Sequence, residues 1–317
     1  MQKAIQAEAV SKTFRAKKFT GKILSDLFFH SYESVKAVNS ASLEVKDGEI
    51  FGLIGANGAG KTTLIKCLSG IIFPDSGSIL INNKTPENAK LEIGAMFGNT
   101  LLYYRLTGYD NLKFYAKLYG VNGYDERIRE ISKKFGLEKF LNKYVETYSL
   151  GMKTKISLAR AMLHDPNIVF LDEPTLGLDP VFSAAIRKMI KHSGKTIFIT
   201  SHYMEEVEEL CDRIAFISRG NILAIGTAEQ LKKSVEKHAA VIVETGFEPK
   251  LVEQLKKSEF VIAVYHIRKG LKILLKQDSD LPSLLKILAQ HNIKKIQERE
   301  ASLEDVFVKL AGEEIGI

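Results

Sequence analysis

The stretch Gly55-Ala56-Asn57-Gly58-Ala59-Gly60-Lys61-Thr62 decides how the first half of this chain is interpreted. It fits the pattern G-x-x-x-x-G-K-[ST] at every constrained position. Residues 49–54 before it form an apolar run typical of a buried parallel strand, and residues 63–68 after it have the spacing of a helix with one apolar face. This strand–loop–helix context predicts a loop that binds phosphate through backbone N–H groups and a helix N-terminus.

Two side chains of this loop have their own expected roles in a nucleotide site that runs from Gly55 to Thr63. Lys61 is expected to reach the β- and γ-phosphates, and the hydroxyl of Thr62 is expected to bind Mg²⁺. A glycine-rich turn with a chance lysine is the alternative interpretation, and the regular elements on both sides disfavour it.

A second run, Ile168-Val169-Phe170-Leu171, is followed directly by Asp172 and Glu173. A buried strand would deliver Asp172 at its C-terminal edge, where the carboxylate can hold Mg²⁺ beside Thr62. Glu173 comes one step later and is placed to polarise an attacking water. A solvated acidic turn is the alternative, and the upstream phosphate loop disfavours it.

Composition is that of an ordinary globular protein with one large or two medium domains: 317 residues, 45% hydrophobic and 26% charged. No apolar run reaches the roughly 18 residues needed to span a bilayer, and residues 1–6 show no signal core, so a cytosolic chain is expected. Cys67 and Cys211 lack metal-ligand spacing and are expected to be buried structural thiols. The net charge of +7 permits an anionic partner, but surplus lysine is more often solvated surface.

The order of apolar runs and helical patterns predicts an α/β fold with a parallel sheet and crossover helices. Residues from about 104 to 165 are mostly helical in pattern. After residue 225 the order strand–helix–strand–strand–helix–strand suggests a small ferredoxin-like α+β domain, closed by a helix over 302–310. We therefore predict two domains, 1–225 and 226–317.

A basic stretch, residues 15–36, separates the first two predicted strands, 7–14 and 37–45. Its apolar positions have rough helical spacing, which permits a short amphipathic helix. These positions are Ile23, Leu24, Leu27, Phe28 and Phe29. The stretch is either a surface insertion that packs its own apolar face or a helix that docks near a membrane or a partner.

Further along, Tyr148-Ser149-Leu150-Gly151-Met152 resembles the signature motif of the ATP-binding cassette (ABC) ATPases, usually written L-S-G-G-Q. Residues 175–179 resemble the D-loop of that family, and Thr200-Ser201-His202 resembles its switch histidine. With the phosphate loop and the acidic pair, the resemblance covers residues 14–202. It implies a phosphate-loop ATPase cassette with a mixed sheet core and a helical subdomain at about 101–160.

The resemblance also implies roles for single residues. Phe14 matches the aromatic residue that stacks on adenine, Glu173 the catalytic base and His202 the residue that senses the γ-phosphate. Ser149, Leu150, Gly151 and Met152 match the signature that contacts the γ-phosphate of ATP held by another copy. Asp179 matches the residue that communicates across the dimer.

Two positions depart from the family pattern. Met152 stands where the signature usually has glutamine, while the serine and the second glycine are kept. Asn99 stands where a glutamine is expected to reach the nucleotide and Mg²⁺, and its side chain is one methylene shorter. Gly98 is the alternative occupant of that position.

One phosphate loop and one signature in the chain imply a homodimer that closes on two ATP molecules, if the signature acts in trans. The end of the chain, residues 301–307, and residues 175–180 resemble ATPase subunits of bacterial drug, sodium and natural-product exporters. The resemblance implies a subunit that powers a separate transmembrane permease, contacts it through the helical subdomain, and sits peripherally at the cytoplasmic face of the cell membrane.

Two other functions stay open. An importer ATPase is the nearer alternative, and a non-transport ABC ATPase acting on the ribosome or on nucleic acid is the other. The ribosome-associated type usually carries two cassettes with a charged linker, whereas this chain has one. The nucleic-acid type needs a long coiled coil, and we find no sustained heptads, so no nucleic acid is expected as a partner.

Overall fold

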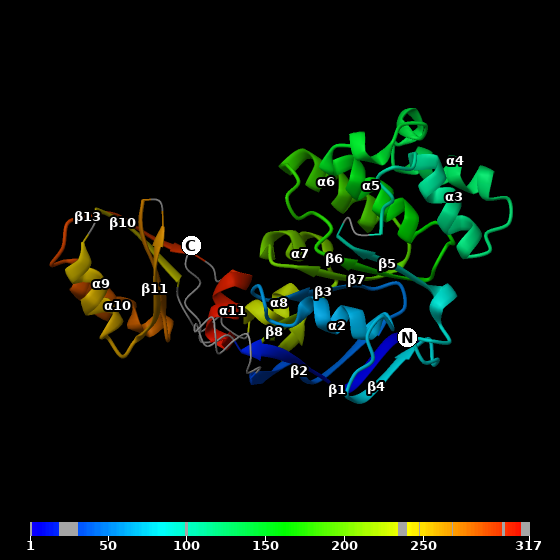
Figure 1. Cartoon of the computed structure of the whole chain (residues 1–317). Coiled ribbons are helices and arrows are strands. Elements are labelled where there is room, and N and C mark those ends of the chain that lie inside the picture. Colours follow the sequence, from blue (N-terminus) through cyan, green and yellow to red (C-terminus); the bar gives the residue numbers. More distant parts are fainter. Residues whose placement is uncertain are drawn as a thin grey trace. The chain divides into compact units, whose positions relative to one another are not determined.

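The structure is a computed structural model that describes residues 2–18, 31–98, 101–233, 240–246, 248–267, 269–299 and 302–311. The chain divides into two compact units, Met1–Ile222 and Leu223–Ile317 (Figure 1). The domain boundary predicted after residue 225 falls within strand β9 (Asn221–Gly226), next to this division. Of the helices in the described ranges, none is both long and apolar enough to cross a bilayer.

The core of the first unit is a six-stranded sheet with the order β5-β6-β7-β3-β8-β9. Neighbouring strands from β5 through β8 run parallel. Their bounds are β3 (Ile50–Ile54), β5 (Ile93–Phe97), β6 (Ile168–Asp172), β7 (Thr196–Ser201) and β8 (Arg213–Ser218). In register, Asp172 lies opposite Thr200 and Ile54 opposite Ser201. The segments that follow β3, β6 and β7 therefore leave the sheet at the same edge.

A second, antiparallel sheet has the order β2-β1-β4, with β1 (Lys3–Lys18), β2 (Ser31–Lys46) and β4 (Ser76–Ile81). Both long strands extend beyond their predicted bounds, because they pair with each other as far as Lys18 and Ser31. Residues 15–18 and 31–36 of the predicted basic insertion thus belong to strands. The helix suggested by residues 23–29 lies outside the described residues.

The α-helices described between residues 61 and 233 belong to the first unit, except α8, which belongs to the second. They are α2 (Lys61–Leu68), α3 (Gly108–Leu118), α4 (Tyr124–Lys134), α5 (Leu150–Ala161), α6 (Pro180–Lys191), α7 (Met204–Leu210) and α8 (Ala228–Lys233). The predicted helical region thus contains α3, α4 and α5 (Figure 1).

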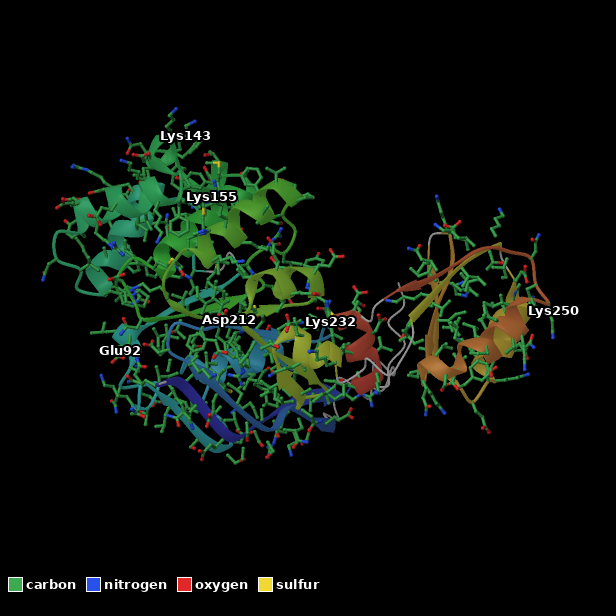
Figure 2. The ribbon with its side chains drawn as sticks, turned by 180° about the vertical axis from the view of Figure 1, so that it is seen from behind. Glu92, Lys143, Lys155, Asp212, Lys232 and Lys250 are labelled. Carbon is green, nitrogen blue, oxygen red and sulfur yellow. The ribbon has the colours of Figure 1, made fainter. Side chains whose placement is uncertain are left out.

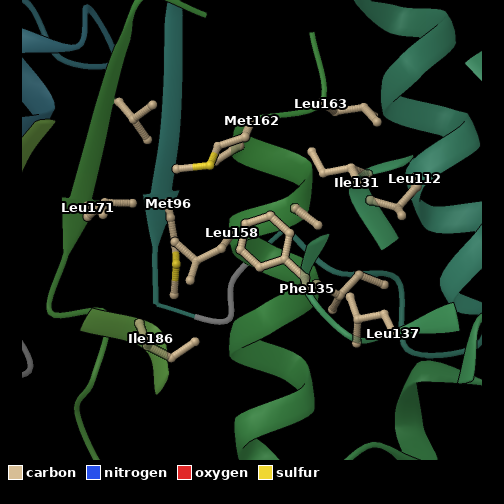
Figure 3. Close-up of a cluster of buried hydrophobic side chains, with 14 of the residues drawn as sticks. Met96, Leu112, Ile131, Phe135, Leu137, Leu158, Met162, Leu163, Leu171 and Ile186 are labelled. Atoms are coloured by element: carbon tan, nitrogen blue, oxygen red, sulfur yellow. The ribbon is translucent and has the colours of Figure 1, made fainter. Parts of the chain in front are cut away.

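One apolar core joins that helical region to the sheet. Phe135 and Leu158 from the helical part are buried in the same cluster as Met96 of β5 and Leu171 of β6 (Figure 3). Since Leu171 directly precedes Asp172, this packing fixes the strand that carries the acidic pair. Burying a side chain of this size contributes about 1.5–3 kcal/mol.

Besides α8, the described part of the second unit contains an antiparallel sheet of order β11-β12-β10-β13 and three more α-helices. The bounds are β10 (Ala240–Thr245), α9 (Pro249–Lys256), β11 (Val261–Ile267), β12 (Gly270–Leu275), α10 (Leu281–Leu288), β13 (Ile293–Arg299) and α11 (Leu303–Ala311). The predicted strand–helix–strand–strand–helix–strand order is confirmed, and the sheet order is that of a split βαβ unit.

Both faces of this second sheet are covered. Ile273 packs in a cluster with Leu251 of α9 and Leu284 of α10, whereas Leu274 packs with Val308 of α11. Successive residues of a strand point to opposite faces, so α9 and α10 cover one face and α11 the other. On the α11 side, Lys272 Nζ lies 2.7 Å from Asp305 Oδ1, and both side chains are buried.

Asp305 also organises the start of α11, since its Oδ2 accepts hydrogen bonds from the backbone N–H and the hydroxyl of Ser302, both at 2.8 Å. Removing its charge should therefore leave Lys272 buried without a counter-ion. We expect Asp305→Asn to destabilise the second unit by about 3 kcal/mol in urea unfolding of the full chain.

A matched control is Glu253→Gln, which neutralises the exposed pair between Glu253 and Lys257 on α9. It should change the unfolding free energy by less than about 0.5 kcal/mol. If the two variants change the unfolding free energy equally, the buried Lys272–Asp305 pair is no more important for stability than an exposed one.

Candidate nucleotide site and catalytic centre

The phosphate loop follows β3 and depends on glycine for space. A Cβ at Gly55 would lie 2.3 Å from the carbonyl oxygen of Ile217, and one at Gly60 would lie 2.2 Å from that of Ala37. Gly60 also has a φ of 106°, in the region that side chains disfavour. The backbone of neighbouring segments thus passes too close to these two positions for any larger residue.

Lys61 begins α2 and is buried, with its amine folded back against the loop. Its Nζ donates to the carbonyl oxygens of Gly55 at 2.7 Å and Ala56 at 3.3 Å. The same amine lies 3.2 Å from Glu173 Oε1. The positive charge predicted to contact phosphate is therefore held between the loop and the predicted catalytic base.

Asp172 ends β6, and its carboxylate accepts hydrogen bonds from hydroxyl groups on two other elements. Thr62 Oγ1 donates to Asp172 Oδ2 at 3.0 Å, and Thr200 Oγ1 donates to Asp172 Oδ1 at 2.6 Å. The Thr62–Asp172 juxtaposition predicted from sequence is present in the structure. Thr200 was named from sequence only as part of the motif that contains His202, and its hydrogen bond to Asp172 was not predicted.

Glu173 occupies a constrained position, with a φ of 51° that a non-glycine residue seldom adopts. Its backbone N–H donates to both the side-chain and the backbone oxygen of Thr200, each at 3.1 Å. One carboxylate oxygen faces Lys61, and the other is hydrogen-bonded to His202 Nδ1. Two groups therefore fix both oxygens of the carboxylate.

The oxygens of Thr62 and Asp172 are hard donors of the kind that Mg²⁺ prefers. Within the described ranges, no group of three or more His, Cys, Asp or Glu residues could hold a metal on its own. This donor set fits Mg²⁺, because that ion usually binds through one or two carboxylates together with substrate phosphates and water.

Other predicted site residues lie on different elements. Ser149 is the N-cap of α5 and accepts from the N–H of Met152 at 3.3 Å, and Asp179 caps α6 by accepting from Val181 and Phe182. The hydrogen bonds of Ser149 and Asp179 thus stay within their own helices. Phe14 is half-exposed on β1, and Asn99 lies outside the described residues.

Comparison with protein families and with known relatives identifies the family of this chain. A model described as "ABC transporter" matches residues 38–176, and one described as "ATP-binding protein DrrA1-3-like, C-terminal domain" matches residues 226–311. The linearmycin resistance ATP-binding protein LnrL of Bacillus subtilis is 34% identical over 297 residues, covering 89% of this chain and 96% of that protein. The chain belongs to the ATP-binding subunits of ABC transporters.

Another relative of this ABC ATPase is the bacitracin transport ATP-binding protein BcrA of Bacillus licheniformis, 36% identical over 89% of this chain and 94% of that protein. Among solved structures, an ATP-binding subunit of an ABC transporter superposes with a TM-score of 0.60 at 27% identity, covering 73% of this chain and 92% of that one. A dimeric bacterial ABC transporter cassette gives 0.61 at 23% identity, covering 70% and 98%, and shows the fold alone. The predicted cassette fold is confirmed, and the ABC ATPase binds and hydrolyses ATP.

The position of Lys61 generates a direct test. Lys61→Ala removes a buried cation from the phosphate loop, so ATP binding should weaken by about 2 kcal/mol or more, roughly thirtyfold in Kd. Titration with a fluorescent ATP analogue would measure this. Lys66→Ala, which removes a lysine from the last turn of the same helix, should leave the Kd unchanged; a similar loss in both variants would contradict the assignment.

Proposed function

We propose that this ABC ATPase powers a separate transmembrane permease of the exporter type through ATP-driven closure of a homodimer. The observation that carries the proposal is the convergence of Lys61, Asp172, Glu173 and His202 at one edge of the sheet. Export is supported by a relative named as a fluoroquinolone export ATP-binding protein, and relatives named for linearmycin resistance and bacitracin transport agree with it.

In the proposed reaction, backbone N–H groups of the loop and the amine of Lys61 bind the phosphates of ATP. Glu173 takes a proton from a water molecule as the water oxygen bonds to the γ-phosphorus and the bond to ADP breaks. His202, hydrogen-bonded to the second oxygen of Glu173, holds that carboxylate in place and reaches the same phosphate. Preorganised charges of this kind supply much of the rate enhancement in such sites.

Mg²⁺ belongs to this proposal as the ion that Thr62 and Asp172 would hold. Bound there, it would offset the negative charge of the phosphate oxygens. The hydroxyl of Thr200 would then orient the carboxylate of Asp172 from its other oxygen. Asn99 stays a proposed further contact to the nucleotide and the ion.

The homodimer rests on the chemistry of the signature. Ser149 stands at the N-terminus of α5, where the helix dipole favours an anion. Exposed apolar side chains surround the two helix starts, with Leu150 43%, Leu176 53% and Val181 78% exposed. We propose that a second copy covers them and brings its own ATP to Ser149, with Asp179 at the same interface.

Glu173→Gln tests the catalytic base and the dimer together. The amide cannot take a proton, so hydrolysis should fall by a factor of a hundred or more, while ATP binding persists. With hydrolysis blocked, size-exclusion chromatography should show an ATP-dependent dimer that Lys61→Ala does not form. Normal turnover by Glu173→Gln would contradict the catalytic role, and an ATP-bound monomer would contradict the dimer.

The helical part offers a surface for the permease. The rings of Tyr103 and Phe114 contact edge to face, with centroids 5.1 Å apart, and both remain more than 40% exposed. Leu118, one turn further along α3, is 67% exposed, so it extends the same face. We call Tyr103, Phe114 and Leu118 the α3 patch, and propose that a cytoplasmic segment of the permease covers it and holds the ATPase peripherally at the membrane.

Lysines border the helical part. The amine of Lys153 lies 5.1 Å from the ring centre of Tyr104, and Gly108, which begins α3, donates its N–H to the carbonyl of Lys143. Figure 2 shows Lys143 at the outer edge of this part of the molecule, and its side chain is exposed. A permease segment with apolar and acidic side chains would complement this surface.

Recovery of partners from native membranes tests the α3 patch. A tagged wild-type chain should recover an integral membrane protein, and Phe114→Ser should recover severalfold less of it, as quantified by mass spectrometry. Phe73→Ser makes the same exchange at an exposed phenylalanine between α2 and β4 and should behave as wild type. Recovery of ribosomes or nucleic acid in place of a permease would overturn the transport proposal.

A further inference from the structure

Glu206 is a buried carboxylate in the first turn of α7 that the reaction above does not use. Its Oε2 accepts two hydroxyl hydrogen bonds, from Thr175 Oγ1 at 2.8 Å and from Ser201 Oγ at 2.9 Å. All three residues are at most 5% exposed. Burying a carboxylate is costly unless hydrogen bonds satisfy it, and here both hydrogen bonds are made to Oε2, while the buried Oε1 accepts none from the described residues.

The two donors come from the two segments that carry the catalytic pair. Thr175 is two residues after Glu173, and Ser201 directly precedes His202. The Ser201 hydroxyl donates to Glu206, because an ionised carboxylate can only accept, and the same hydroxyl oxygen accepts the N–H of Tyr203 at 3.0 Å. One oxygen of Glu206 therefore connects the segment after β6 to the last residue of β7.

A third element approaches the same carboxylate. Arg187 Nη1, from α6, lies 4.0 Å from Glu206 Oε1, and Arg187 Nε lies 2.9 Å from Glu209 Oε2. Since α6 begins at Pro180, directly after Asp179, the helix that follows the D-loop also approaches Glu206 through Arg187.

We propose that Glu206 is a positioning residue for ATP hydrolysis, which holds Glu173 and His202 in register by binding the hydroxyls of Thr175 and Ser201 at one oxygen. This inference rests on the proposed catalytic roles of Glu173 and His202. It assigns to Glu206 no contact with ATP. Its effect passes through the geometry of the Glu173–His202 hydrogen bond, where displacements of about 1 Å can cost a hundredfold in rate.

The competing interpretation is that Glu206 only stabilises the start of α7. A helix-capping carboxylate accepts backbone N–H groups of its own helix, whereas both hydrogen bonds of Glu206 Oε2 come from side chains outside α7. The two interpretations differ in what they predict for the rate and for stability.

The experiment uses Thr175→Val, which removes one hydroxyl donor and keeps the shape of the side chain. We expect kcat for ATP hydrolysis to fall about tenfold or more, with the Kd for ATP and the melting temperature close to wild type. Glu206→Gln keeps an oxygen that can accept both hydroxyls, so it should retain more activity than Glu206→Leu.

Thr196→Val is the matched control, since Thr196 is a buried threonine at the other end of β7 whose hydroxyl donates to Asp47. It should lower the melting temperature and leave kcat unchanged. If Thr175→Val instead lowers the melting temperature with no effect on kcat, Glu206 is structural and the inference is overturned.

Measuring Glu173→Gln in the same assay distinguishes a failure of the catalytic assignment of Glu173 from a failure of the positioning role of Glu206. An inactive Glu173→Gln beside a fully active Thr175→Val would overturn the role of Glu206 and leave the proposed function intact. A fully active Glu173→Gln would overturn the catalytic assignment, and the role of Glu206 with it.

Discussion

The parallel register of β3, β6 and β7 is the constraint on which the site depends. It places Asp172 opposite Thr200 and Ile54 opposite Ser201, so three loops from distant parts of the sequence begin at one level. A slip by one residue would turn every side chain of a strand to the other face and separate Asp172 from both of its hydroxyl donors. Every residue of these three strands is buried, so the polar ends of β6 and β7 stand out from otherwise apolar strands.

Hydroxyl groups make it possible to keep this much negative charge at the edge of a packed sheet. Asp172 accepts hydrogen bonds from the hydroxyls of Thr62 and Thr200. Glu206 accepts hydrogen bonds from the hydroxyls of Thr175 and Ser201. A hydroxyl satisfies a carboxylate oxygen without adding a competing positive charge. The amine of Lys61 and the ring of His202 are then directed to one carboxylate alone, that of Glu173, which is the group with the proposed chemistry.

Sequence patterns predicted the parts of the fold and site that are local or periodic. The phosphate loop, the strand ending at Asp172 and the alternation after residue 225 each occupy one continuous segment, and the structure contains them. The hydrogen bond from Thr200 to Asp172 and those from Thr175 and Ser201 to Glu206 were missed, because they depend on which strands are neighbours, and no sequence spacing encodes that. The full lengths of β1 and β2 were missed for the same reason, since each strand extends as far as its partner does.

The close packing of Gly151 carries a mechanical consequence. A Cβ at this position would lie 2.9 Å from the ring of Phe182, so the first turn of α5 rests directly on the first turn of α6. The starts of α5 and α6, which Ser149 and Asp179 cap, therefore have no room to slide past each other. In the proposed dimer, a shift of one helix start would therefore carry the other with it, so the signature and Asp179 would meet or leave the second copy in the same movement.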